Sequence, residues 1–104
     1  MKSTLHLKVI NPKGMHTLPS QSLSDSINQI NNRPDITIKI SCAGKLDSKL
    51  VNRVIDLSKE SFSSLDLLGY GRGCTFYIEI KGENSRETKK ELIEYIDFDY
   101  LEVL

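Results

Sequence analysis

The stretch Cys74-Thr-Phe-Tyr-Ile-Glu-Ile-Lys81 alternates between apolar and polar residues. Successive side chains of a β-strand point to opposite faces of a sheet, so this alternation predicts a strand with one apolar face. Two earlier segments alternate in the same way. Their apolar positions are Leu5, Leu7 and Val9 in the first segment and Ile36, Ile38, Ile40 and Cys42 in the second. Half-apolar strands are typical of an antiparallel sheet that has one covered face and one face in water.

Three stretches are predicted to form the helices that cover this sheet. Residues 19–30 have apolar side chains at helical spacing, and Pro19 suits the first turn of a helix. A second helix is expected over residues 47–57 because Leu, Val and Ile recur there after residues that cap helices well. A third helix is expected after Asn84, which is also a good capping residue.

The remaining segments complete the predicted order of strand, helix, strand, short strand, helix, strand and helix. Gly44 and Lys45 are expected to form a hairpin turn that leads into a short strand near Leu46. Residues 58–68 fit this order least well, and the apolar tail at residues 98–104 is expected to pack onto the body of the protein. The predicted fold is one α+β domain, in which three helices pack on one face of a four-stranded antiparallel sheet.

The composition limits the classes of function. The 104 residues include 14 Lys plus Arg and 14 Asp plus Glu, so the formal net charge is zero. Proteins that bind nucleic acids or anionic membranes by bulk electrostatics usually have a basic excess, so we expect no nucleic-acid partner. No apolar run approaches the roughly 18 residues of a membrane span, and we expect a cytoplasmic protein without membrane insertion. Cys42 and Cys74 lack the spacing of zinc and redox motifs and are interpreted as reduced packing thiols, with a redox pair as the alternative.

The segment Gly14-Met15-His16-Thr17-Leu18-Pro19 joins the first predicted strand to the first predicted helix. A helix N-terminus offers unpaired backbone N–H groups and the positive end of the helix dipole, so an anion bound there is stabilised. Neutral histidine is nucleophilic near neutral pH because its reference pKa is about 6.5. This placement makes His16 a candidate phosphoryl acceptor. The alternative is a histidine that is simply solvated in its loop.

This segment resembles the active-site motif of the histidine-containing phosphocarrier proteins (HPr) of the sugar phosphotransferase system, which reads Gly, aliphatic, His, small, Arg, Pro. The predicted order of strands and helices is similar to the open-faced β-sandwich of that family. The stretch Gly69-Tyr-Gly-Arg-Gly73 and the strand after it resemble the glycine loop and last strand of the family. The resemblance runs from about residue 5 to residue 96, with an insertion near residues 58–68 and a C-terminal extension at residues 98–104.

The resemblance implies a function and a set of site residues. In the family, the matching histidine takes a phosphoryl group on Nδ1 from a phosphohistidine of Enzyme I and passes it to a sugar-transporter component. His16 would be this acceptor, and the backbone N–H groups of Thr17 and Leu18 would bind the phosphoryl oxygens. The implied protein is a monomeric carrier in a relay rather than a stand-alone enzyme, and it requires neither a metal nor a cofactor.

Leu18 departs from the family pattern, because the family has an arginine there that helps to bind the phosphoryl group. Losing a charge-assisted hydrogen bond costs about 1.5–3 kcal/mol, which slows transfer roughly ten- to a hundredfold if the loss falls on the transition state. Lys13 and Arg72 are candidates for the missing charge, with simple solvated cations as the alternative. Leu18 and Met15 are also candidates for an apolar docking surface.

Some members of the family carry a regulatory serine at the start of their second helix. The favoured alignment keeps a helix over residues 47–57 and places Leu50 at this position, which predicts that the switch is absent. Counting back from Gly69 instead places Ser61 there, so Ser61 is the alternative candidate for phosphorylation by a kinase. Two other functions compete with the carrier: a binding or regulatory module that relays no phosphate, and an unrelated sandwich that buries His16 in its core.

Overall fold

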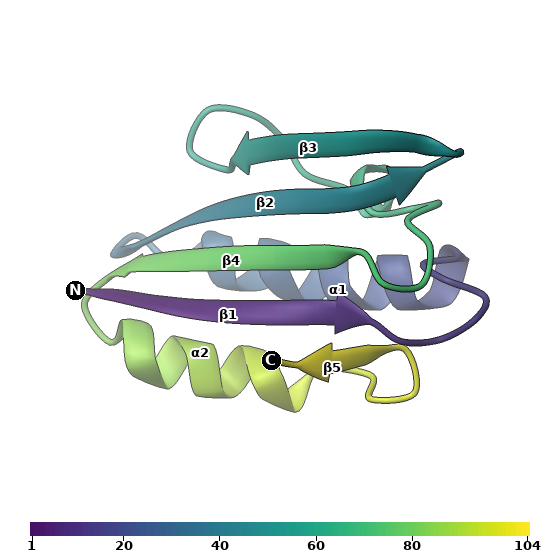
Figure 1. The fold of residues 1–104 in the computed structure, drawn as a ribbon. Coiled ribbons are helices and arrows are strands. Elements are labelled where there is room, and N and C mark those ends of the chain that lie inside the picture. Colours follow the sequence, from purple (N-terminus) through teal and green to yellow (C-terminus); the bar gives the residue numbers. More distant parts are fainter.

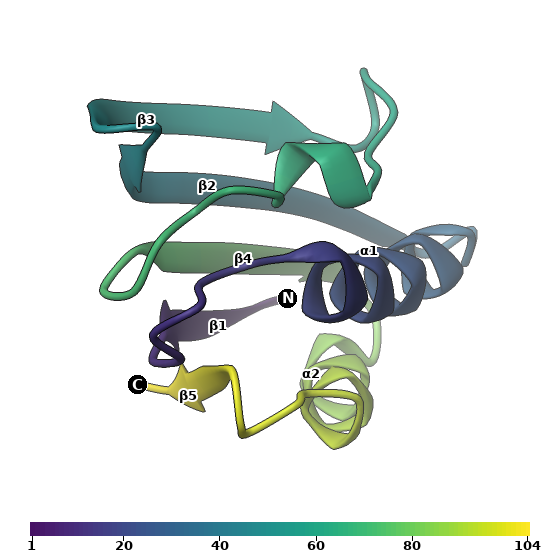
Figure 2. The same cartoon turned by 90° about the vertical axis from the view of Figure 1, so that its right-hand side faces the viewer.

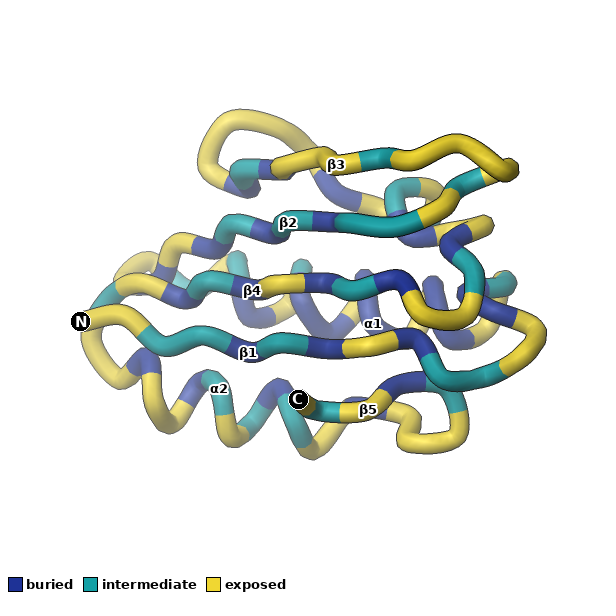
Figure 3. Tube along the Cα trace, viewed as in Figure 1, coloured by how far each residue is buried: buried dark blue, intermediate teal, exposed yellow.

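The three alternating segments form neighbouring strands, as predicted. In the computed structural model, which describes residues 1–104, these strands are β1 (Lys2–Val9), β2 (Ile36–Leu46) and β4 (Thr75–Gly82). They form the centre of a five-stranded antiparallel sheet of order β3-β2-β4-β1-β5 (Figure 1). Their apolar positions point to one side and are buried, while the positions between them are more exposed (Figure 3).

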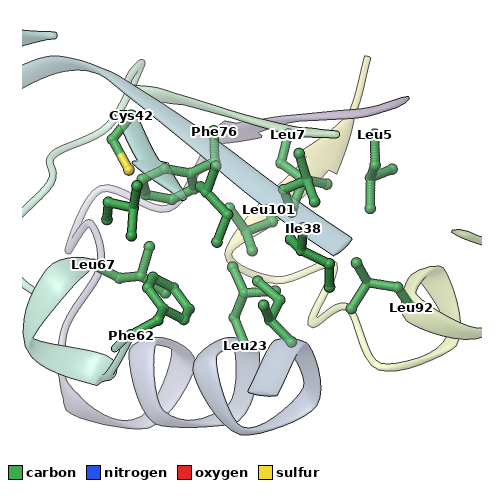
Figure 4. Packing of buried hydrophobic residues seen from close by; sticks show 14 of the residues in the cluster. Leu5, Leu7, Leu23, Ile38, Cys42, Phe62, Leu67, Phe76, Leu92 and Leu101 are labelled. Carbon is green, nitrogen blue, oxygen red and sulfur yellow. The ribbon is translucent and has the colours of Figure 1, made fainter. Parts of the chain in front are cut away.

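Two helices cover one face of the sheet. Helices α1 (Thr17–Asn31) and α2 (Ser85–Glu94) lie on the same side of it, as Figure 2 shows, and neither is long and apolar enough to cross a membrane. Leu23 of α1 and Leu92 of α2 are buried against the strands (Figure 4). Ile27 of α1 belongs to the same buried cluster. The prediction of an α+β fold with an antiparallel sheet covered on one face is therefore confirmed. The helices expected after residue 19 and after Asn84 are both present.

The helix expected over residues 47–57 is wrong, because most of this stretch forms strand β3 (Lys49–Asp56). Its apolar residues also fit a strand, since Val51 and Ile55 face the helices while Leu50 and Val54 lie on the opposite face. Three of these four residues are the β-branched Val and Ile, which favour strands. All eight residues of β3 pair with β2, and this pairing stabilises the strand. The spacing of apolar residues within one segment carries no information about such a partner.

The hairpin turn also lies later than predicted. Asp47 and Ser48 form it with φ angles of 50° and 66°, as the two central residues of a type I′ turn require. Gly44 instead lies inside β2 with φ 136°, and a Cβ atom there would lie only 2.4 Å from Cys74 Sγ. This glycine thus marks a close approach between segments rather than a turn.

Residues 58–68, which fitted the predicted order least well, and the C-terminal tail both pack onto the body. Residues 58–68 contain a short 3-10 helix, η1 (Ser64–Asp66), and bury the side chains of Phe62 and Leu67 (Figure 4). The tail adds a fifth strand, β5 (Leu101–Val103), at the edge of β1. The structure therefore has two α-helices and five strands, where the sequence predicted three helices and four strands.

Both cysteines are free and buried beneath the sheet. Burial raises the pKa of the Cys42 thiol to about 11, although a hydrogen bond with Tyr70 opposes this effect. Burial likewise raises the pKa of the Tyr70 hydroxyl to about 12. A thiol that stays protonated at neutral pH is a poor nucleophile, so these features favour the interpretation of Cys42 as a packing residue.

Candidate functional site

His16 is the N-cap residue of α1 and ends the loop that follows β1. Its backbone is extended, with φ −96° and ψ −169°, and its C=O accepts a hydrogen bond from the Ser20 N–H at 3.1 Å. The His16 side chain does not cap the helix. The N–H groups of Thr17 and Leu18 therefore have no partner, and Pro19 has no N–H to satisfy. Two donors at the positive end of a helix dipole thus adjoin the imidazole.

The His16 ring is only partly buried and contacts a tyrosine from the C-terminal tail. Nε2 of His16 lies 2.8 Å from the Tyr100 hydroxyl, and the two rings meet edge to face with centroids 5.0 Å apart. Nδ1 of His16 makes no hydrogen bond. One ring nitrogen is therefore held by Tyr100, while the other is available for chemistry. The reading in which His16 lies in the core does not apply.

Backbone hydrogen bonds fix Tyr100 in this position. The Ile10 N–H donates to the Tyr100 C=O at 2.9 Å, and the Asn11 side-chain amide donates to the Asp99 C=O at 3.1 Å. Immediately after Tyr100, β5 pairs with β1 through Leu101 and Val9. The loops before α1 and before β5 thus form one unit, which positions the Tyr100 hydroxyl against His16.

This contact limits the protonation states that suit nucleophilic attack by His16. Neutral imidazole has one N–H and one lone pair, on different nitrogens. If the Tyr100 hydroxyl donates to Nε2, the proton lies on Nδ1 and blocks it. If Nε2–H donates to the Tyr100 oxygen, Nδ1 carries the free lone pair. A tyrosine hydroxyl accepts as readily as it donates, so Tyr100 is compatible with the reactive tautomer.

The glycine loop, residues 69–73, is attached to the segment that precedes His16. The Met15 N–H donates to the Tyr70 C=O at 2.8 Å, and the Gly69 N–H donates to the Met15 C=O at 2.9 Å. Gly14 has φ 68°, and a Cβ atom there would lie 2.6 Å from the Tyr70 oxygen. A larger residue at position 14 would therefore push the two loops apart.

The two candidate cations lie near this junction without contacting His16. Lys13 precedes Gly14 and is exposed, and neither Lys13 nor Arg72 makes a side-chain hydrogen bond or ion pair. Arg72 lines an open hollow of about 250 Å³ on the side of the glycine loop that faces β2, together with Lys45. The structure thus brings their backbones close to the candidate site and leaves their side chains free.

Leu18 and Met15 do not form the exposed apolar pair that the sequence suggested. Leu18 is 75% exposed, whereas Met15 is only 2% exposed and belongs to the core. The difference follows from the two backbone hydrogen bonds of Met15, which hold this residue against the glycine loop beneath the sheet. Leu18, two residues after His16, is thus the exposed apolar residue of this segment.

Ser61 is exposed in the segment between β3 and η1. The helix on which the favoured alignment relied is strand β3, so Leu50 does not lie at the start of a helix. The serine that does cap a helix here is Ser63, whose hydroxyl accepts a hydrogen bond from the Leu65 N–H at 3.2 Å. No group of three or more His, Cys, Asp or Glu side chains is arranged to hold a metal ion.

Tyr100 is the site residue that sequence analysis missed. The tail was expected to pack on the body, but nothing in the spacing of its residues indicates contact with His16 more than 80 positions earlier. The signal that was available is chemical: Tyr100 combines a polar hydroxyl with a ring in an otherwise apolar tail. A buried or half-buried tyrosine hydroxyl usually finds a hydrogen-bond partner, and histidine is a suitable one.

Ser20 → Ala is expected to stabilise the protein by about 1 kcal/mol. Ser20 lies one turn into α1 behind His16, and its hydroxyl is fully buried without a hydrogen-bond partner. Alanine removes that unsatisfied group and also favours the helix. Thermal unfolding should shift upward by roughly 4–8 °C for a domain of this size. Ser26 → Ala is the matched control, because the buried Ser26 hydroxyl does donate to the Ser22 C=O at 2.9 Å, and it should show a smaller gain or a loss. Equal shifts in both variants would contradict the prediction.

Comparison of the sequence with protein-family models and with curated proteins finds no match. Among solved structures, the chain is similar to the phosphocarrier protein HPr from Bacillus anthracis str. Ames, with 21% identity and a TM-score of 0.46 over 92% of this chain and 98% of that chain. It is also similar to HPr-C-His from Thermoanaerobacter tengcongensis, with 20% identity and a TM-score of 0.45 over 92% and 90% of the two chains. These similarities concern the fold and assign no activity, partner or site residue to this chain.

Proposed function

We propose that the protein is a phosphocarrier, which accepts a phosphoryl group on His16 from Enzyme I and passes it to a sugar-transporter component. The observation that carries this proposal is the geometry of His16, whose Nε2 is held by the Tyr100 hydroxyl at 2.8 Å while Nδ1 has no partner. Thr17 and Leu18 are the two residues that follow His16, and their unpaired N–H groups support the binding of an anion at the start of α1.

The proposed transfer needs no cofactor, because one N–P bond forms on His16 while another breaks on the donor histidine. The lone pair of His16 Nδ1 attacks phosphorus of the donor phosphohistidine, an N–P bond forms, and the donor N–P bond breaks with its electron pair returning to the donor imidazole. The Nε2 proton stays on His16 and continues to donate to the Tyr100 oxygen. Delivery to the transporter component repeats the same displacement with His16 as the leaving group.

Backbone N–H groups are expected to carry most of the electrostatic stabilisation in this proposal. The Thr17 and Leu18 N–H groups would bind phosphoryl oxygens, and they need no reorganisation because the helix fixes them. Lys13 and Arg72 are free to approach an added dianion, since neither is engaged in an ion pair. Both residues therefore remain candidates for a supporting charge. Phosphorylation of Ser61 remains a separate regulatory proposal, supported only by its exposure.

The function is tested by incubating the purified protein with Enzyme I and labelled phosphoenolpyruvate. We expect one equivalent of label that is lost in acid and kept in base, as a phosphoramidate is. A known HPr labelled in parallel shows that the donor is active. A protein that stays unlabelled while that control is labelled would contradict the phosphocarrier proposal.

A binding or regulatory module that relays no phosphate is the second candidate. The observation that favours it is Leu18, which is 75% exposed two residues after His16 and supplies no charge to a phosphoryl group. A stable complex with a partner that survives His16 → Ala, together with absent labelling, would support this candidate. Labelling and delivery at the rate of a known carrier would exclude it as the main function.

Tyr100 → Phe is expected to slow phosphoryl acceptance about five- to tenfold. The variant keeps the edge-to-face ring contact with His16 but removes the hydroxyl that holds Nε2, and a hydrogen bond of this kind contributes about 1 kcal/mol. Tyr95 → Phe is the matched control, because the Tyr95 side chain is exposed and makes no side-chain hydrogen bond. An unchanged rate in Tyr100 → Phe would show that the contact has no positioning role.

A further inference from the structure

The outer edge of β3 is open. β3 is the last strand of the sheet on this side, and no other strand pairs with its outer edge (Figure 1). With eight residues it is a long edge strand, whereas the edge at the other end of the sheet is the three-residue strand β5. Long open edges present a row of unpaired backbone groups that can pair with another strand.

The hydrogen bonds to β2 identify which backbone groups of β3 point outward. Just beyond the strand, the Leu57 N–H donates to the Ile38 C=O at 3.0 Å. Residues of an antiparallel strand bond alternately to one side and the other, so Val51, Arg53 and Ile55 bond to β2. Their neighbours Leu50, Asn52 and Val54 therefore turn their N–H and C=O groups outward.

The same three residues also place their side chains on the open face of the sheet. Ile55 is buried opposite Ile40, so odd-numbered residues of β3 face the helices and even-numbered ones face away. Leu50 is 84% exposed and Val54 is 54% exposed. Edge strands are usually protected by charged side chains, and on the open face of β3 the only charged residue is Asp56 at its last position.

One antiparallel register makes this edge complementary to a second copy of itself. When Asn52 faces Asn52 of the second copy, Leu50 of each copy faces Val54 of the other. The backbone N–H and C=O groups of all these residues point outward, so they can pair across the two-fold axis. A shift of two residues in either direction opposes like charges, either Arg53 with Arg53 or Lys49 with Arg53. A shift of one residue opposes residues from different faces of the sheet.

We propose that two copies of this chain pair through the outer edges of β3, antiparallel about Asn52, to form one continuous sheet. Each of the opposed pairs exchanges two backbone hydrogen bonds, and Leu50 of each copy meets Val54 of the other on the open face, which gives two apolar pairs on either side of the Asn52 pair. A second copy fits the outer edge of β3 in this register, because it supplies an apolar side chain opposite each exposed apolar residue. The monomer expected from the sequence is the other outcome of the test below.

The proposed interface leaves the candidate functional site free. β3 lies at one edge of the sheet, while Tyr100 precedes β5 at the opposite edge (Figure 2). A dimer would therefore expose one His16 at each far end. The inference does not depend on the phosphocarrier proposal, and labelling of His16 should be the same in monomer and dimer.

The association state is tested by sedimentation over a range of protein concentrations. We expect a concentration-dependent species of twice the 11.8 kDa chain mass. Asn52 → Pro should abolish it without unfolding the chain, because the Asn52 N–H points away from β2 and proline removes only that outward donor. Far-ultraviolet circular dichroism shows whether the variant is folded. A wild-type protein that stays at the chain mass at millimolar concentration would overturn the proposal.

A charge-paired set of variants tests the register itself. The double variant Leu50 → Lys, Val54 → Lys opposes two lysine pairs across the axis and should weaken dimerisation at least about tenfold. The double variant Leu50 → Lys, Val54 → Glu is equally polar, but it opposes lysine to glutamate and should keep the dimer, with added sensitivity to salt. Within one chain the two positions are roughly 13 Å apart, so they interact little. Equal association of the two variants would contradict this register.

Discussion

His16 → Gln is expected to lower phosphoryl acceptance below detection, the largest effect predicted for this protein. Glutamine keeps a polar side chain of similar reach, and its amide N–H can donate to the Tyr100 oxygen as His16 Nε2–H does in the reactive tautomer. An amide nitrogen has no available lone pair, so no N–P bond forms. The measurement is the acid-labile label left after incubation with Enzyme I and labelled phosphoenolpyruvate.

His6 → Gln is the matched control, because His6 is the only other histidine of the chain. His6 lies on β1 opposite Tyr77 of β4, and their rings meet edge to face with centroids 5.4 Å apart. It has no helix N-terminus beside it, so substitution should leave labelling unchanged. If the label persists in His16 → Gln and disappears in His6 → Gln, the phosphoryl acceptor is His6, and the proposed site is contradicted.

The central strands could be predicted from sequence because their signal is local. Alternation at Ile36, Ile38 and Ile40 has only one simple explanation, since a helix would place these residues around its circumference. Residues 47–57 give no such unique answer. Val51, Val54 and Ile55 fit both a helix face and a strand, and pairing with β2 decides between them. The turn was hidden because Asp47 and Ser48 adopt positive φ angles that are usually assigned to Gly or Asn.

The part of the candidate site that consecutive residues form could be predicted from the sequence. The part that distant segments form could not. His16, Thr17 and Leu18 are consecutive, so a helix start places the imidazole beside unpaired N–H groups. The Tyr100 contact requires β5 to pair with β1, and a pairing of three residues leaves little periodic signal. The burial of Met15 likewise depends on its hydrogen bonds to the glycine loop. Long-range pairing, rather than local propensity, determines both features.

Leu18 → Arg is expected to accelerate phosphoryl acceptance roughly ten- to a hundredfold. Leu18 is 75% exposed at the second residue of α1, so a longer side chain meets no steric barrier and can fold back toward a phosphoryl group on His16. A charge-assisted hydrogen bond from its guanidinium contributes about 1.5–3 kcal/mol, and each 1.36 kcal/mol changes a rate about tenfold. The measurement is the initial rate of labelling at a fixed, catalytic amount of Enzyme I.

Leu18 → Gln separates the added charge from the loss of an apolar side chain. It removes the exposed leucine without supplying a cation, so the rate should stay near that of the wild type if the missing charge is the only deficit. If Leu18 instead contacts a partner, both variants lose that contact and both slow. An arginine near a helix N-terminus also opposes the dipole by about 0.3–1 kcal/mol, so a small fall in stability should accompany the gain in rate. Slower labelling of both variants would therefore assign Leu18 to docking, whereas acceleration by arginine alone would assign it to an incomplete phosphoryl site.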